Sequence, residues 1–280
     1  MVPLYDAHNH FQDDWLTPHR ATVDAELRRM GLRRAVVNGT SETDWPAVVD
    51  LARQYNWVVP TFGLHPWDVG NRTSAWQATL EAALAGNAEA KIGEIGLDRW
   101  ILDRAKPDDP RLAGLRRAPL EEQIEVFTWQ LELAARRNRA SSIHCLDAFG
   151  ATLDVLTRTP RPACGFLLHA YSGPAEMVKK FADLGAYFSF NGSFLDPRHA
   201  AKQDVFKTIP ADRVLVETDA PAMRLPSAHE KFPPLATPDG TVANHPANIA
   251  AVYAGLAELR GVPLAKLADQ VEANFVRLFG

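Results

Sequence analysis

Eight short runs of apolar and β-branched residues recur along the chain, separated by stretches with helical periodicity. The runs cover residues 3–9, 34–39, 58–64, 90–97, 141–145, 165–170, 186–191 and 214–218. A strand followed by a helix, repeated, favours a parallel sheet, because parallel neighbours need a crossover connection. Eight such units are the number that closes a sheet into a barrel. We therefore predict an α/β fold of the (β/α)8 TIM-barrel type.

Length and composition bound the remaining possibilities. The chain has 280 residues, 46% of them hydrophobic, and a barrel of ~250 residues commonly forms one unit, so we expect a single domain over 1–280. A formal net charge of −4 gives no sign of a basic nucleic-acid-binding surface. The N-terminal residues lack the basic stretch followed by an apolar stretch that is typical of a signal peptide. No segment offers the ~18 apolar residues of a membrane span. We expect a cytoplasmic protein without membrane contact or an obligate protein partner.

Two connections are too long to be simple loops between a strand and a helix. Residues 99–119 are rich in Arg, Asp and Pro, and residues 222–246 contain several prolines that suppress regular structure. Both follow strand ends, so both are expected over the active face. The two cysteines, Cys145 and Cys164, fall at opposite ends of neighbouring predicted strands and are expected to be unpaired, small buried residues.

Chemistry-bearing side chains stand where the predicted strands end. In the first strand, the period-2 geometry aims His8 and His10 at the same side. Four later strands end with one such group each, and these are Glu94, His144, His169 and Asp219. A lone histidine at a strand end is more often a hydrogen-bonded structural residue. Groups of this kind at the ends of five strands indicate a metal centre at one mouth of the barrel, where barrel enzymes carry their catalytic residues.

The ligand types restrict the metal. Nitrogen and carboxylate ligands without cysteine suit Zn2+, Mn2+ or Mg2+, and six groups are more than one tetrahedral site uses. We therefore predict two divalent metal ions. The first ion would take His8, His10 and Asp219, the second His144 and His169, and Glu94 would bind both. Two ions ~3.5–4 Å apart can activate a shared water for hydrolysis, especially of phosphate esters.

The sequence also resembles the TatD family of metal-dependent deoxyribonucleases, part of the amidohydrolase-like barrel group. The resemblance extends over nearly the whole chain and is carried by these segments: Asp6-Ala7-His8-Asn9-His10, Gly63-Leu64-His65-Pro66, Gly93-Glu94-Ile95-Gly96-Leu97-Asp98, Gln123 with Phe127 and Gln130, Ile143-His144, His169-Ala170-Tyr171-Ser172-Gly173, Glu217-Thr218-Asp219-Ala220-Pro221, and Asn274 with Leu278-Phe279.

What the resemblance implies is a hydrolase that cleaves DNA phosphodiesters through a metal-activated water. Glu94 would bridge the metals, Asp219 would be both ligand and proton acceptor, and His65 would lie near the metals and contact the phosphate or the leaving group, or else form a structural hydrogen bond. Hydrolysis of a small-molecule phosphoester, amide or lactone is the alternative. A non-catalytic binding barrel is disfavoured because all six ligand positions are filled.

The sequence departs from the family pattern in two places. Arg99-Trp100 and a long loop replace an aromatic pair, and Cys145-Leu146-Asp147 follows His144 where an arginine is common. Basic residues of the loop either replace that arginine or form a solvated surface; they are Arg99, Arg104, Lys106, Arg111, Arg116 and Arg117.

Several further side chains are candidates for supporting roles. Trp67 and Trp100 could stack on a base or simply close the barrel mouth, and Arg99 is a candidate substrate contact. Glu217 and Asp98 are predicted to orient ligand histidines from outside. The remaining histidines fall in loops and are expected to be exposed; they are His19, His199, His229 and His245.

Overall fold

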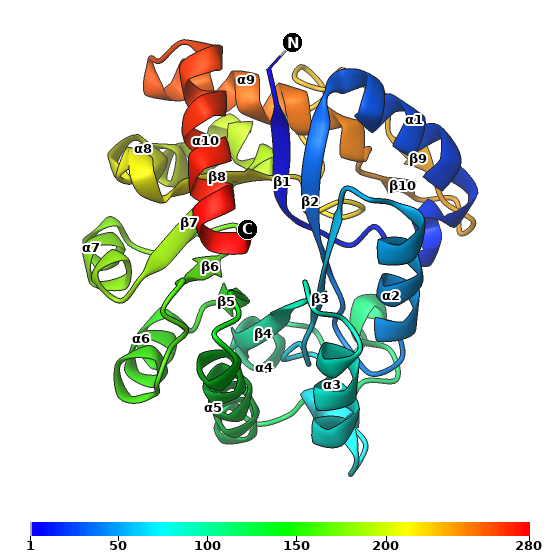
Figure 1. The fold of residues 1–280 in the computed structure, drawn as a ribbon, viewed down its shortest axis with the longest axis vertical. Helices are drawn as coiled ribbons and strands as arrows, with labels where there is room; N and C mark the ends of the chain where they lie inside the picture. Colours follow the sequence, from blue (N-terminus) through cyan, green and yellow to red (C-terminus); the bar gives the residue numbers. More distant parts are fainter. Residues whose placement is uncertain (1) are drawn as a thin grey trace.

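The computed structural model describes residues 2–280. Its main sheet has eight parallel strands in the order of the chain: β1 (Leu4–Asn9), β2 (Leu32–Asn38), β3 (Val58–Phe62), β4 (Lys91–Asp98), β5 (Ser141–Leu146), β6 (Phe166–Leu168), β7 (Ala186–Asn191) and β8 (Val214–Glu217). Figure 1 looks into the ring of strands, with the helices outside it. The predicted (β/α)8 barrel is confirmed, and each of the eight predicted strands is present with ends shifted by at most two residues.

The ring closes between its first and last strands. The backbone N–H of Asp219 donates to the carbonyl oxygen of His8 at 2.9 Å, and that of His10 donates to Ala220 at 2.7 Å. The buried carboxylate of Asp6 spans the same junction, accepting the N–H of Thr218 at 3.1 Å and its hydroxyl at 2.6 Å. We call this junction the β1–β8 seam.

Helices surround the barrel: α1 (Arg20–Met30), α2 (Trp45–Gln54), α3 (Trp76–Ala85), α5 (Leu120–Arg137), α6 (Phe149–Arg158), α7 (Ala175–Asp183), α8 (Ala200–Thr208), α9 (Ile249–Arg260) and α10 (Leu264–Phe279). On α5, the longest of these helices, Phe127, Leu131 and Ala134 are fully buried. Strand and helix side chains together form one apolar core. No helix in residues 2–280 has the length and apolar character needed to cross a membrane.

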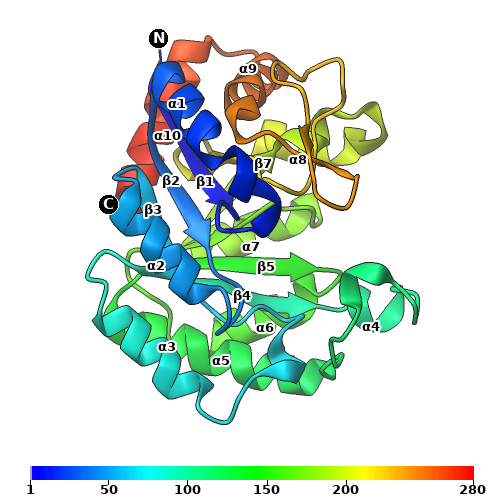
Figure 2. The ribbon, with the colours of Figure 1, turned by 90° about the vertical axis from the view of Figure 1, so that its right-hand side faces the viewer.

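Both long connections lie beyond the carboxyl ends of the strands, as predicted. In Figure 2 the arrowheads of β4 and β5 point toward α4 (Trp100–Asp103), which belongs to the 99–119 connection. The 222–246 connection is not wholly irregular, because it contains a short hairpin of β9 (Leu235–Ala236) and β10 (Val242–Ala243).

Some predictions of exposure were wrong. His245 is buried, with its Nε2 3.0 Å from a carboxylate oxygen of Glu26 and its ring against Phe232. The other loop histidines are half-buried, as are the two cysteines, which form no disulfide. Long connections fold back onto the barrel here, so position in a loop did not mean exposure to water.

Candidate metal centre

The six predicted ligands converge at the carboxyl ends of the strands. His8 lies on β1, Glu94 on β4 and His144 on β5, whereas His10, His169 and Asp219 directly follow β1, β6 and β8. All except His8 line one open cavity of about 730 Å³. His8 is fully buried behind it.

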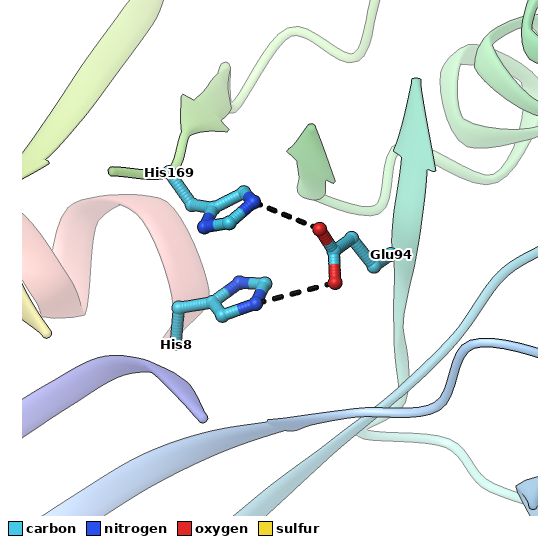
Figure 3. A group of neighbouring side chains, drawn as sticks. All are labelled: His8, Glu94 and His169. Carbon is cyan, nitrogen blue, oxygen red and sulfur yellow. Dashed lines mark ion pairs between the residues drawn. The ribbon is translucent and has the colours of Figure 1, made fainter. Parts of the chain in front are cut away.

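Glu94 faces histidine imidazoles with both of its carboxylate oxygens, and Figure 3 shows one contact of each oxygen, with His169 and with His8. Its Oε2 lies 3.3 Å from His8 Nε2 and 3.4 Å from His10 Nε2. Its Oε1 lies 2.8 Å from His169 Nε2 and 3.0 Å from His144 Nδ1. One carboxylate therefore presents a different oxygen to each pair of histidines, which is the geometry that a bridging ligand requires.

Two further side chains complete these groups. Asp219 Oδ1 lies 3.4 Å from His10 Nε2 and 3.6 Å from His8 Nε2, so these three residues can share one cation. On the other side, His65 Nε2 lies 3.5 Å from Glu94 Oε1 and forms a group with Glu94 and His144. His65 thus lies slightly farther from Glu94 than the four predicted ligand histidines do.

The outer nitrogen of three histidines is fixed by a neighbour. His8 Nδ1 pairs with Ser142 Oγ at 2.8 Å, and His10 Nδ1 lies 2.9 Å from the carbonyl oxygen of Asn38. His144 uses its Nε2, 3.1 Å from Asp98 Oδ2. Each contact leaves the other nitrogen turned toward Glu94, as ligand histidines need. Ser142 lies two residues before His144 on the same strand. Its side chain could therefore have been predicted to point to the same side as that of His144.

Asp98 also holds the tryptophan at the cavity wall. Trp67 Nε1 donates to Asp98 Oδ2 at 2.7 Å, and the ring of Trp67 stacks on Trp100 with centroids 6.2 Å apart. Arg111 covers the Trp100 ring, 4.5 Å from its centroid. Arg99 pairs with Asp103 at 2.8 Å. Of the three substrate contacts predicted from the sequence, Trp67 alone is among the cavity-lining residues of the described chain.

Glu217 faces His169, as predicted, but at a longer distance than a hydrogen bond. Its Oε1 lies 3.7 Å from His169 Nδ1, which has no hydrogen-bond partner within residues 2–280. The carboxylate accepts from the backbone N–H of Ala170 at 3.2 Å, from Asn191 Nδ2 at 3.0 Å and from the hydroxyl of Ser189. Glu217 therefore anchors the backbone beside His169.

The glycines around Glu94 allow β4 and β5 to approach closely. Gly96 has a φ of +140°, and a Cβ there would lie 2.0 Å from the carbonyl oxygen of His144. The register between the strands shifts between Ile92 and Ile95, across Glu94. On the outside, the buried amide of Gln123 bonds both backbone groups of Asp98, accepting at 2.9 Å and donating at 3.2 Å. This packing holds the glutamate and its histidine partners in place.

The protonation of the centre follows from burial and mutual attraction. Burial raises the pKa of Glu94, but the charges of His169, His65 and His8 and a hydrogen bond with His144 outweigh it and hold that pKa well below its usual range. Burial lowers the pKa of His10, yet its hydrogen bond to Asp219 and the nearby carboxylates raise it to about 9. The negative charge of the carboxylates thus favours positive charge close to the histidine nitrogens.

This donor set fits divalent cations. Four imidazoles and two carboxylates converge without a thiolate, and Glu94 has one oxygen for each group. Such nitrogen and oxygen ligands suit Zn2+ and Mn2+. They suit Mg2+ less well, because Mg2+ prefers oxygen ligands.

Comparison with known proteins agrees with this centre. A sequence model described as TatD related DNase matches residues 5–280. This chain belongs to the TatD related DNase family. The 3′-5′ ssDNA/RNA exonuclease TatD of Shigella flexneri is 31% identical over 266 residues, covering 93% of each chain. The uncharacterized metal-dependent hydrolase YabD of Bacillus subtilis is 26% identical, covering 99% of this chain and 98% of its own. Among solved structures, the TatD homologue YjjV of Escherichia coli superposes with a TM-score of 0.83 at 26% identity, covering 99% of this chain and 97% of the other. The chain is therefore a TatD-family member of the metal-dependent hydrolase type.

Proposed function

We propose that this chain hydrolyses phosphodiester bonds of single-stranded nucleic acid with two divalent cations. The observation that carries the proposal is Glu94, whose two oxygens face different pairs of imidazoles at a cavity wall. The substrate class is the one in the name of the Shigella flexneri relative. A cytoplasmic location and action as one domain over 1–280 are parts of the same proposal.

The proposed partition gives His8, His10 and Asp219 to one ion and His144 and His169 to the other, with Glu94 shared. The distances from each Glu94 oxygen support this division. Zn2+, Mn2+ and Mg2+ all remain candidates.

His65 fits a donor role better than a ligand role. The backbone N–H of Trp67 donates to His65 Nδ1 at 3.2 Å, so Nδ1 is the acceptor nitrogen and Nε2 carries the proton. Burial lowers the pKa of His65, which keeps the ring neutral near pH 7. A protonated Nε2 has no lone pair for a metal, but it can donate a hydrogen bond to the leaving oxygen.

Bound divalent cations would lower the pKa of a water molecule and polarise the phosphoryl group. Asp219 would be the group that accepts the proton of the attacking water. Burial raises the pKa of Asp219, but its hydrogen bond with His10 and the charges of the histidines lower it below its usual value. The carboxylate is therefore ionised at neutral pH, as a proton acceptor must be.

Hydrolysis of a small-molecule phosphoester is the second candidate. It is favoured by the acidic side chains that line the cavity beyond the metal ligands, because repeated phosphates would be repelled there. An amide or lactone hydrolase on the same centre is the remaining alternative.

The test is a reconstitution assay. Metal-free protein is loaded with Zn2+, Mn2+ or Mg2+ and offered labelled single-stranded DNA and RNA, bis(p-nitrophenyl) phosphate, and a panel of amides and lactones. We expect cleavage of the phosphodiesters, and we expect Glu94→Gln to weaken binding of both ions while keeping the side-chain size. Loaded protein that hydrolyses amides or lactones but leaves every phosphodiester intact would overturn the proposal.

Metal analysis of single variants tests the roles. His8→Ala should empty the first site before the second, and His144→Ala should do the reverse. His65→Ala should retain both ions and lose activity. Loss of one ion from His65→Ala would make His65 a ligand instead.

A further inference from the structure

The cavity that holds the proposed metal centre carries an uneven charge. Six carboxylates line it, belonging to Asp13, Asp14, Asp44, Asp68, Glu94 and Asp219. Glu94 and Asp219 are committed to the metal centre, but the other four are not. Within residues 2–280, Lys202 is the one lysine or arginine that lines the same cavity.

Lys202 is placed to meet a ligand. It is the third residue of α8, which follows β7, so it stands at the catalytic end of the barrel. Its Nζ lies 4.6 Å from the centroid of the Phe194 ring, and Phe194 also lines the cavity. No ion pair in the described part of the chain involves Lys202, and its side chain is half-buried. A lysine held over an aromatic ring and left without a carboxylate partner is available to an anion.

The arginines of the 99–119 connection are paired with other groups. Arg104 pairs with Asp147 at 3.3 Å, Arg111 with Asp109 at 2.7 Å, and Arg116 with Glu122 at 2.7 Å. Arg117 donates to the carbonyl oxygens of Ile101 and Ala105 at 3.1 and 3.0 Å. These contacts favour the interpretation of this loop as a folded surface over its use as a phosphate clamp.

Two of these carboxylates, Asp44 and Asp68, lie across the ring from the lysine. Asp44 follows β2 and Asp68 follows β3, and in a closed ring of eight strands β3 and β7 stand opposite each other. A chain of phosphates crossing the mouth is therefore repelled on the β2–β3 side and attracted on the α8 side.

We propose that Lys202 binds the phosphate adjacent to the scissile one, so that a nucleic-acid strand leaves the cavity over α8. This inference rests on the proposed phosphodiesterase function. The β2–β3 side then receives the part of the substrate without further phosphates.

The test compares substrates with one phosphate and with several. Lys202→Gln should raise KM for a single-stranded trinucleotide by about 10-fold, as loss of a charge-assisted hydrogen bond does, with kcat nearly unchanged. KM for bis(p-nitrophenyl) phosphate should not change, because this substrate has no second phosphate. Lys202→Arg should restore the trinucleotide KM. Lys207→Gln is the matched control, since Lys207 lies on the same helix but pairs with Asp204 at 2.8 Å.

A binding measurement separates this inference from the proposed function. Fluorescence polarisation with a labelled phosphorothioate trinucleotide reports affinity without turnover. If wild-type protein cleaves no phosphodiester but Lys202→Gln still weakens this binding, the proposed function fails and the role of Lys202 stands. If cleavage occurs and Lys202→Gln binds and cleaves the trinucleotide like wild type, the inference is overturned and the function stands. Equal losses on both substrates would also overturn it, because they would indicate a structural role.

Discussion

Replacing Asp98 with Asn should weaken one metal site selectively. Asp98 Oδ2 accepts from Trp67 Nε1 at 2.7 Å and faces His144 Nε2 at 3.1 Å, while Oδ1 accepts the N–H of Ile101 at 3.1 Å. An Asn has one acceptor oxygen, so either His144 and Trp67 or Ile101 must face an amide NH2 group. Asp98 is fully buried, and water cannot compensate.

The magnitude follows from these contacts. Loss of an outer partner of a ligand histidine typically costs roughly 10–100-fold in metal affinity, or about 1.4–2.8 kcal/mol. One buried donor left unpaired costs about 1–3 kcal/mol of stability. The melting temperature of metal-free protein should therefore fall by about 2–10 °C.

The assay is a competition titration of metal-free protein against a fluorescent chelator, together with elemental analysis. We expect the site of His144 and His169 to lose affinity while the site of His8 and His10 changes little. Asp103→Asn is the matched control, because that carboxylate lies five residues after Asp98 and pairs with Arg99 near the surface. Equal weakening of both sites, or no change in either, would refute the reasoning.

Three further outcomes are expected. Asp219→Asn should fold and bind metal weakly, and its kcat should fall by roughly 10²–10⁴; activity within about threefold of wild type at saturating metal would shift the base to another group. Burial and the negative charges of Asp44 and Glu94 raise the pKa of Asp68 to about 7, so Asp68 gains its charge above that pH. KM for a single-stranded trinucleotide should then rise between about pH 6 and pH 8, and a profile of the same slope in Asp68→Asn would contradict this cause. Shortening the tip of 99–119 should alter KM or substrate choice while metal content, measured by elemental analysis, is retained. An unchanged substrate profile would contradict this expectation.

The sequence was sufficient for the barrel and for the meeting of the ligands. Strand positions follow from local apolar runs, and strand ends in a parallel barrel must share one face, so His8 and Asp219 could be brought together without knowing any contact. The contacts of Glu217 could not be predicted in the same way, because alternation along a strand gives the face of a residue and not its distance of 3.7 Å from His169.

Other parts of the site could not be predicted from sequence patterns. Lys202 lies near the start of a helix after two short turns, where no periodicity tells which way a side chain points. The carbonyl oxygen of Asn38 that fixes His10 belongs to the backbone and carries no sequence signal. His245 was wrongly expected in water because its burial depends on a connection that folds back over α1 to reach Glu26.

The β1–β8 seam distinguishes the two proposed metal sites by the strands that supply their ligands. The ion held by His144 and His169 takes its ligands from the middle of the chain, where β8 contributes only Glu217, which anchors the backbone beside His169. The ion held by His8, His10 and Asp219 joins the first strand to the last, across the junction that Asp6 and Thr218 also bridge. Binding of this ion should therefore stabilise the closed ring, and the free energy of unfolding should rise with the logarithm of the free metal concentration.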